Sequence, residues 1–259
     1  MTRFATWNVN SLRVRQERIE QWLTDIGPDI VCMQETKIAD DAFPQLTFEA
    51  MGYTAAHHGE GRWNGVAILS RQGLDDVSFG FADGGDHDAE ARLMTARCGG
   101  ITVVTVYVPN GRALDSDHYQ YKLSWLDRLA AHVDAVTEPG DPVIVAGDFN
   151  IAPTDVDVYD PGAFVGSTHV SGPERARLET LEGRGLVDVF RHVHPDAPRV
   201  FSWWDYRRGD FHEGRGMRID LVLASEPVVR RAEWCIIDRN ARKGQQPSDH
   251  APVVVDLTD

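Results

Sequence analysis

Apolar residues along this 259-residue chain follow two patterns, short continuous runs and longer stretches of helical period. The run at residues 142–146 consists mostly of small and β-branched residues between Pro139-Gly140 and Pro153, which predicts a buried strand. Residues 14–26 and 116–136 carry apolar side chains every three or four positions instead, which predicts amphipathic helices. Ser11 precedes the first of these helices and is expected to cap it.

The same patterns place further elements along the chain. Helices are expected at residues 41–51 and 173–181, and strands at 4–8, 29–34, 53–57, 66–70, 92–98, 101–108, 200–203, 217–224, 228–237 and 252–257. Gly99-Gly100 predicts a hairpin between two of these strands. Strands follow one another in the second half, which argues against a regular alternation of strands and helices. No repeat or linker-like stretch interrupts the chain, so a single domain is expected over residues 1–259.

Composition narrows the class of protein. With 42% hydrophobic residues the chain can bury a sizeable core, and no apolar run approaches the roughly 20 residues needed to cross a membrane. The first residues read as a strand and lack a signal-peptide pattern, so a cytoplasmic protein is expected. Cys32, Cys98 and Cys235 are odd in number and far apart, which predicts reduced core residues. The net charge of −14 argues modestly against a nucleic-acid partner, unless a basic face or a divalent metal reverses the local field.

Acidic and amide side chains collect at the expected strand ends. Asp148 and Asn150 follow the strand at 142–146 and, being two residues apart, are expected to point to the same side. A turn capped by these two side chains is the alternative interpretation. The other polar residues at strand ends are Asn8, Glu35, Asp220, Asp249 and His250. Hard oxygen donors with few histidines favour Mg²⁺, or Mn²⁺ as a substitute, over zinc, and fit a metal-dependent phosphoesterase.

Short motifs in a fixed order extend this picture over the whole chain. They are Trp7-Asn8-Val9-Asn10, Gln34-Glu35-Thr36-Lys37, Asn64-Gly65-Val66-Ala67-Ile68-Leu69-Ser70, Tyr107-Val108-Pro109-Asn110-Gly111, Gly147-Asp148-Phe149-Asn150, Trp203-Trp204-Asp205-Tyr206, Arg218-Ile219-Asp220 and Ser248-Asp249-His250. In this set and order the chain resembles the exonuclease III family of apurinic/apyrimidinic endonucleases, within the endonuclease/exonuclease/phosphatase superfamily. The resemblance implies an α+β fold, a four-layer α/β/β/α sandwich of two packed mixed β-sheets with helices on the outer faces. It also implies a site at one end of the sandwich.

The resemblance assigns metal ligands. Glu35 matches the principal Mg²⁺ ligand, with Asn8 and Asp249 nearby. Three further residues match possible ligands of a second metal site: Asp148, Asn150 and His250.

The same resemblance assigns catalytic roles. Asp148 matches the residue that activates the attacking water or handles the proton of the leaving group, and Asn150 matches the residue that orients the phosphate or the nucleophile. His250, held by Asp249, matches the contact to the scissile phosphate. The remaining site residues are Tyr107, near the phosphate, and Asp220, supporting the histidine or the proton transfer.

Substrate recognition is implied by the same motifs. Trp203, Met217 and Ile219 match an apolar pocket for a flipped-out deoxyribose without a base. Met217 replaces an aromatic residue of some relatives, so the pocket is expected to be looser. Candidate DNA contacts lie in flanking loops, with Arg62 and Asn110 favoured: Lys37, Arg62, Trp63, Asn110, Arg112, Lys122, Arg207 and Arg215. Before Arg218 the family often has an Asn-x-Gly run that this chain lacks, which leaves the contact by Arg215 open.

The resemblance implies a Mg²⁺-dependent DNA repair enzyme that cleaves 5′ to abasic sites in duplex DNA. Exonuclease activity from 3′ to 5′ and removal of 3′ blocking groups are also implied. The expected partner is duplex DNA with abasic or 3′-blocked ends. No membrane partner is expected, and the protein is expected to be a monomer. Two alternatives stay open: a superfamily phosphoesterase for RNA or another phosphoester, and a non-catalytic DNA-binding protein.

Overall fold

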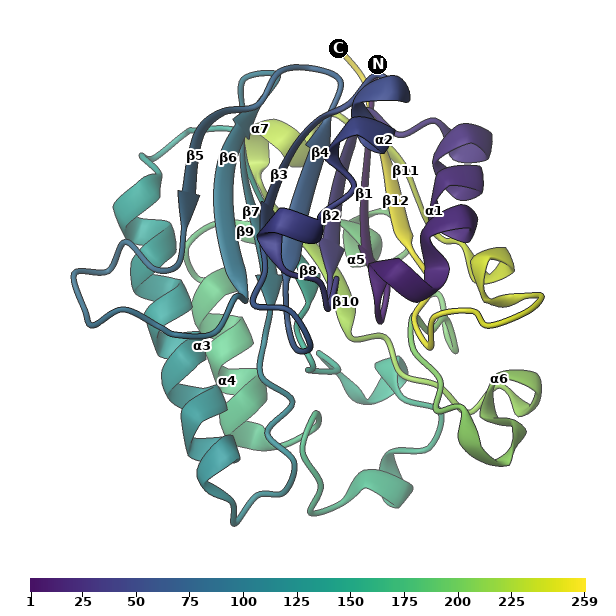
Figure 1. The fold of residues 1–259 in the computed structure, drawn as a ribbon. Helices are drawn as coiled ribbons and strands as arrows, with labels where there is room; N and C mark the ends of the chain where they lie inside the picture. Colours follow the sequence, from purple (N-terminus) through teal and green to yellow (C-terminus); the bar gives the residue numbers. More distant parts are fainter.

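The computed structural model describes residues 1–259 and contains two six-stranded mixed sheets that pack face to face (Figure 1). The first sheet has the order β11-β12-β1-β2-β4-β3, with bounds β1 Thr2–Asn8, β2 Ile30–Gln34, β3 Thr54–His58, β4 Val66–Ser70, β11 Ala232–Ile237 and β12 Val253–Leu257. The second has the order β5-β6-β7-β8-β10-β9, with bounds β5 Asp75–Phe79, β6 Leu93–Cys98, β7 Ile101–Tyr107, β8 Val143–Asp148, β9 Leu186–Asp188 and β10 Asp220–Ser225.

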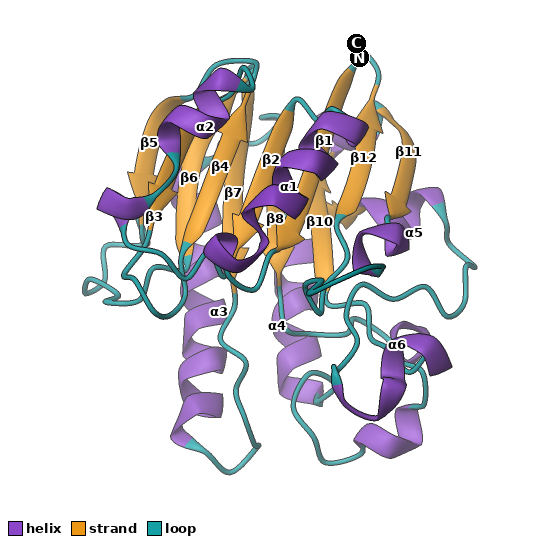
Figure 2. Ribbon diagram, turned by 45° about the vertical axis from the view of Figure 1, so that its right-hand side comes forward, coloured by secondary structure: helices purple, strands orange, loops and turns teal.

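Helices cover the outer faces of both sheets. The seven helices are α1 (Leu12–Ile26), α2 (Gln45–Ala50), α3 (Asp117–Val136), α4 (Gly172–Glu182), α5 (Val189–Val193), α6 (Asp210–Glu213) and α7 (Glu226–Val229). Of these, α1 and α2 pack on the first sheet and α3 and α4 on the second, whereas α5 and α7 contribute to the core between the sheets. Figure 2 shows α1 across the first sheet, with α3 and α4 side by side behind the second. One apolar cluster lies between the sheets, a second joins the first sheet to α1, and a third joins the second sheet to α3 and α4. These three layers of core confirm the expected α/β/β/α sandwich.

Strand direction gathers many chain segments at one end of the sandwich. β1 runs parallel to β2, and β7 runs parallel to β8, so the carboxyl ends of each pair lie together. β12 is antiparallel to β1, and β10 is antiparallel to β8, so both enter the sheets from that same end. The chain termini lie side by side at the opposite end (Figure 1).

Several expected elements differ from those observed. Ser11 caps α1 by accepting from the backbone N of Val14, as predicted, but the Val14 side chain is 54% exposed and lies off the apolar face. The helix expected at 41–51 is interrupted at Pro44, so only α2 is a true helix there. The strand expected at 228–237 is divided, because the short helix α7, with Pro227 in its first turn, includes Val228 and Val229 before β11 begins at Ala232.

Two further differences concern residues 200–203 and the edge strands of the second sheet. The strand expected at 200–203 is absent apart from isolated bridges of Trp203 to Met217 and His250. The edge strands β5 and β9 were not expected. β5 is exposed along its whole length and lacks an apolar face, and β9 has only three residues. The hairpin at Gly99-Gly100 is confirmed, and both glycines adopt positive φ angles, 56° and 84°.

The acidic loop at residues 80–88 packs on α3. The ring of Phe81 lies 5.1 Å from that of Trp125, and the backbone N of Ala82 donates to Nδ1 of His132 over 2.9 Å. Asp83 forms an ion pair with Arg128 over 2.6 Å. The loop is therefore a cover for α3. All three cysteines are buried and unpaired, as expected, and none of the helices combines the length and apolar character of a membrane span.

Candidate active site

Three strand ends place Asn8, Glu35 and Asp148 in direct contact. The amide nitrogen Nδ2 of Asn8 donates to Oε1 of Glu35 over 2.8 Å and to Oδ2 of Asp148 over 2.9 Å. Asn8 and Asp148 are the last residues of β1 and β8, and Glu35 directly follows β2. Asn8 therefore joins the two sheets across the site.

Glu35 has an unusual backbone conformation for its residue type. Its φ angle is 52°, in the left-handed region that residues other than glycine and asparagine rarely adopt. The backbone N of Thr36 and of Lys37 donates to the carbonyls of Gly65 and Asn64, which fixes this turn. Nζ of Lys37 lies 2.6 Å from Oε2 of Glu35, so the carboxylate has a cation beside it.

The turn after β8 holds Asp148 and Asn150 together. Oδ1 of Asp148 accepts from the backbone N of Asn150 over 2.9 Å, and Nδ2 of Asn150 donates to the carbonyl of Val108 over 2.9 Å. Only glycine fits at position 147, where φ is 151° and a Cβ atom would lie 1.9 Å from the carbonyl oxygen of Val106. The two side chains thus share one side of the turn, as their spacing predicts.

Asp220, rather than Asp249, holds the imidazole of His250. Nδ1 of His250 lies 2.8 Å from Oδ2 and 3.1 Å from Oδ1 of Asp220, and both side chains are buried. The oxygens of Asp249 accept instead from Nδ2 of Asn10 and from Nε1 of Trp203. The expectation that Asp249 holds the histidine is therefore wrong, because the carboxylate of Asp249 is engaged by these other two side chains.

Burial and neighbouring charges shift the pKa values of the central pair. Burial, together with the charges of Asp220 and Glu35, raises the pKa of Asp148 to about 7 against the lowering effect of His250. Burial disfavours the charge on His250, but the carboxylates of Asp220 and Asp148 outweigh burial and raise its pKa to about 10. Nε2 of His250 lies 3.8 Å from Oδ2 of Asp148. At neutral pH the imidazole is therefore a cation facing Asp148.

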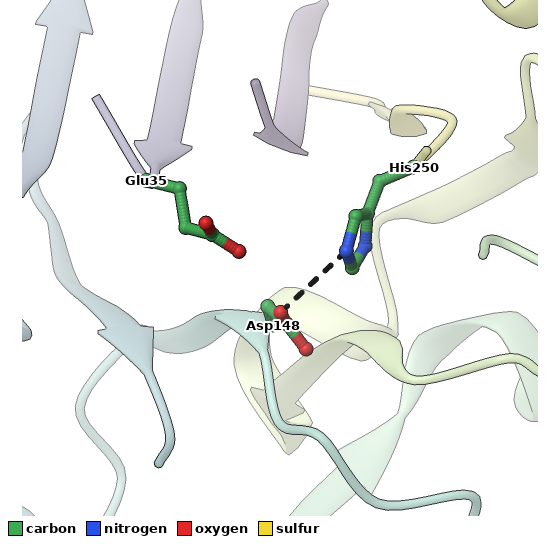
Figure 3. Close-up of side chains that lie close together, drawn as sticks. All are labelled: Glu35, Asp148 and His250. Atoms are coloured by element: carbon green, nitrogen blue, oxygen red, sulfur yellow. Dashed lines mark ion pairs between the residues drawn. The ribbon is translucent and has the colours of Figure 1, made fainter. Parts of the chain in front are cut away.

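Three of these side chains enclose a position where a metal ion could bind. Ligand atoms of Glu35, Asp148 and His250 all lie within 4.8 Å of one another, and their side chains point toward a common centre (Figure 3). The two carboxylates are oxygen donors of the kind that Mg²⁺ or Mn²⁺ prefers, whereas the imidazolium of His250 has no free nitrogen for the ion and can donate a hydrogen bond beside it. Asp249 is not one of these three, although it was expected beside the metal. Asn8 contacts two of them through its amide nitrogen.

Tyr107 completes this end of the second sheet. It lies opposite Asp148 in the parallel register of β7 and β8. The guanidinium of Arg92 lies 4.5 Å from the centre of its ring. Burial and the charge of Glu35 raise the pKa of Tyr107 well above its ordinary value, despite the opposing charge of Arg92. The phenol therefore stays protonated and can donate a hydrogen bond.

Comparison with known proteins identifies the arrangement. A model described as the Endonuclease/Exonuclease/phosphatase family matches residues 5–250. Exodeoxyribonuclease III of Haemophilus influenzae is 32% identical over 262 residues, covering 97% of this chain and 98% of its own. The chain belongs to the endonuclease/exonuclease/phosphatase family. Within that family it is a nuclease of the exonuclease III type, which confirms the resemblance of the motifs.

Solved structures agree with this assignment. An AP endonuclease from Archaeoglobus fulgidus is 37% identical, with a TM-score of 0.96 and 100% of each chain covered. A 3′ phosphatase from Neisseria, bound to a product DNA hairpin, is 38% identical, also with a TM-score of 0.96 and 100% of each chain covered. The sandwich is thus the fold of exonuclease III-type nucleases.

The three residues expected to form a pocket lie together. Met217 and Ile219 belong to one buried apolar cluster with Ala152 and Val158, and the partly buried Trp203 packs against it. Trp203 also forms backbone bridges to Met217 and to His250. This apolar wall therefore adjoins the histidine.

The expected DNA contacts have different surroundings. Arg62, Asn110 and Arg112 are exposed, and the guanidinium of Arg62 lies 5.1 Å from the ring centre of Trp63. Arg215 is engaged by Asp210, whose Oδ1 accepts from its Nε over 2.7 Å. Lys122 is fully buried and paired with Glu174, so the expectation that it contacts DNA is wrong.

Sequence reasoning missed His169. Its Nδ1 contacts the carbonyl oxygen of Asn150 over 2.5 Å, and its Nε2 lies 3.4 Å from Nδ2 of Asn110. Burial and the charge of Lys122 lower the pKa of His169 to about 4, so the ring is neutral at pH 7. It lies in the polar stretch between β8 and α4, outside every motif, so no local signal indicates it.

Proposed function

We propose that this nuclease is a Mg²⁺-dependent DNA repair phosphoesterase that cleaves duplex DNA 5′ to abasic sites. The proposal includes 3′-to-5′ exonuclease activity and removal of 3′ blocking groups, carried out by a monomer that acts as one domain over residues 1–259. The observation that carries it is the group of half-buried Glu35 with buried Asp148 and His250 beside the apolar wall of Trp203 and Met217.

The side chains meet the needs of phosphodiester hydrolysis. Glu35 and Asp148, with Asn8 beside them, would hold Mg²⁺, which when bound supplies positive charge to the phosphoryl oxygens and the leaving oxygen. His250 donates a hydrogen bond from Nε2 as a cation, and Tyr107 and Asn150 are neutral donors. Asp148, whose pKa is about 7, can give or take a proton near neutral pH.

The apolar wall supports recognition of a missing base. A deoxyribose without a base exposes an apolar face that can contact Trp203. A normal nucleotide carries a base that would collide with the apolar wall, so it is excluded. Exposed Arg62, Asn110 and Arg112 supply local polar and positive contacts to the DNA backbone. Such local contacts are needed because the chain as a whole carries a net charge of −14.

A nuclease restricted to 3′ ends is the second candidate. The observation that favours it is the likeness to the Neisseria 3′ phosphatase bound to a product DNA hairpin, at 38% identity. Both candidates use the same carboxylates and histidine. They differ in whether the site accepts a continuous DNA strand, as an endonuclease must, or only a 3′ end.

One experiment separates the candidates. Purified protein is incubated with a duplex carrying a central abasic analogue, with the same duplex undamaged, and with a duplex ending in a 3′ phosphate. Each reaction contains Mg²⁺ or a chelator. Abasic incision that needs Mg²⁺ supports the first proposal, and turnover of the 3′ phosphate alone supports the second. In a parallel competition reaction, an RNA or a small phosphoester is added beside the abasic duplex. Faster turnover of either competitor refutes both proposals, and so does DNA binding without turnover.

A further inference from the structure

Lys122 is a fully buried cation outside the group of side chains that would contact substrate. It lies on α3 and pairs with Glu174 on α4, with 2.5 Å between Nζ and Oε1. Removing two charges from water is costly unless both are paired and fully hydrogen-bonded. An apolar pair would join two helices without that cost, and the ion pair makes contacts that an apolar pair could not.

The ammonium contacts the backbone of two loops, each of which carries an asparagine whose side chain lies at the site. Nζ of Lys122 donates to the carbonyl of Asn150 over 2.7 Å and to the carbonyl of Asn110 over 3.3 Å. The side chains of these two asparagines meet on the other side, where Nδ2 of Asn110 donates to Oδ1 of Asn150 over 3.3 Å. One cation therefore fixes the backbones of two residues that also touch each other.

Glu174 fixes the ammonium in turn and joins it to a third segment. Its Oε1 accepts from Oγ1 of Thr168 over 2.6 Å and from the backbone N of His169 over 3.0 Å. Its Oε2 accepts from the backbone N of Ser171, the residue that caps α4. The carboxylate has donors on both oxygens, and the ammonium has acceptors on several sides, which satisfies a buried ion pair.

Asn150 has a left-handed backbone conformation that depends on the contacts around it. Its φ angle is 50°, and the tight turn through Asp148 directs its side chain. Non-glycine residues in this region cost free energy and persist where the surroundings hold them. The bond from Lys122 to the carbonyl of Asn150 is the contact that reaches this turn from α3.

We infer that the buried Lys122–Glu174 pair is a positioning device that sets Asn150, and with it Asn110, for phosphodiester hydrolysis. The inference rests on the proposed function, because it gives Asn150 a role at the phosphate. Neither Lys122 nor Glu174 touches substrate. Loss of the Lys122 ammonium displaces Asn150, and a displacement of about 1 Å at a reacting group can cost about 100-fold in rate.

The test compares two variants that share a neutral residue at 174. Glu174→Gln keeps the bonds of Lys122 to both carbonyls, so kcat on the cleaved duplex is expected to stay within about threefold of wild type. Lys122→Met/Glu174→Gln removes those bonds without leaving a buried charge, and its kcat is expected to fall about 100-fold with KM within about threefold. Asp127→Asn is the matched control, because Asp127 joins the same two helices through an exposed ion pair with Arg177.

A double-mutant cycle shows whether the pair acts through Asn150. In an Asn150→Ala background the loss caused by Lys122→Met/Glu174→Gln is expected to vanish, whereas a general structural defect would multiply with it. If the pair variant does not fold, Thr168→Val removes the hydroxyl between Glu174 and the carbonyl of Asn110, and is expected to lower kcat about tenfold, the contribution of one hydrogen bond.

The outcomes are distinct. A folded pair variant with the kcat of Glu174→Gln, or a full loss that persists without the Asn150 side chain, overturns the positioning role. An unchanged kcat in Thr168→Val does the same where the pair variant is unfolded. Wild-type protein that leaves DNA intact overturns the proposed function itself, and the inference falls with it.

Discussion

The pair of His250 and Asp220 gives the sharpest prediction, because its charge state can be changed without changing its shape. Asp220→Asn keeps an oxygen near Nδ1 of His250, 2.8 Å away in the wild type, but removes the negative charge. Both side chains are buried, so no solvent replaces that charge. The proton on His250 should therefore be held less tightly in the variant.

The size of the effect follows from the burial of the pair. Removing one charge of a buried pair costs about 3–5 kcal/mol. At about 1.4 kcal/mol per pKa unit this is a fall of roughly two to four units. The pKa of His250, about 10 in the wild type, would then lie between about 6 and 8 in Asp220→Asn. A raised pKa means that the imidazolium is present at low pH and is lost as pH rises through that pKa.

The assay is kcat on the abasic duplex as a function of pH. Wild type should keep its cationic donor up to pH values near 10, whereas the variant should lose activity as pH rises through about 6 to 8. At pH values above this range, kcat of the variant should be about 10²–10³-fold below that of wild type, which is the cost of one missing donor at a developing charge. Asp134→Asn, which removes an exposed carboxylate paired with Arg184, is the control and should leave the profile unchanged. A ratio of wild-type to variant kcat that is constant from pH 5.5 to 9 would refute the reasoning.

Four further predictions concern the metal, the wall and the DNA. Glu35→Ala and Asp148→Asn should each abolish incision of the abasic duplex on denaturing gels; wild-type rates in either would contradict their assigned roles. Adding Mg²⁺ to chelator-treated wild type should raise the Tm in thermal unfolding, because an ion that binds only the folded state stabilises it, and equal shifts in Glu35→Ala would place the ion elsewhere. Trp203→Ala should raise KM for the abasic duplex more than for a 3′-phosphate duplex; equal effects would remove Trp203 from recognition of the missing base. Activity should fall steeply between about 50 and 200 mM salt, because binding rests on a few local cations, and a flat profile would count against DNA as substrate.

The fold and the main site residues could be predicted because both follow from short-range patterns. Runs of β-branched residues identify the central strands, and polar residues at their ends meet because parallel strands bring those ends to one edge. The ordered motifs then identify the family. The exposed edge strand β5 has no apolar face, so periodicity could not reveal it.

The errors in the site come from contacts between distant residues. Asp249 is adjacent to His250, but the side chain that holds the imidazole is Asp220, 30 positions away in the sequence. Lys122 stands three residues after Tyr119 and four before Leu126, so helical spacing alone places it on the apolar face of α3. That spacing indicates burial, but nothing local indicates Glu174, 52 positions away, as the partner that makes burial possible.

Local sequence rules fail most clearly where the site is built, and the reason is physical. Glu35 and Asn150 both have φ near 50°, and Asn10, which donates to Asp249, has φ 44°. Glycine would relieve each of these positions, yet each carries a side chain that contacts the site. At Glu35 this conformation costs about 1–3 kcal/mol, and less at the two asparagines, so it persists only where surrounding contacts hold the backbone. At Glu35 those contacts are the backbone bonds of the next two residues, and at Asn150 they include the buried ammonium of Lys122. The stability of the sandwich therefore supports backbone conformations that isolated turns of this sequence would not keep.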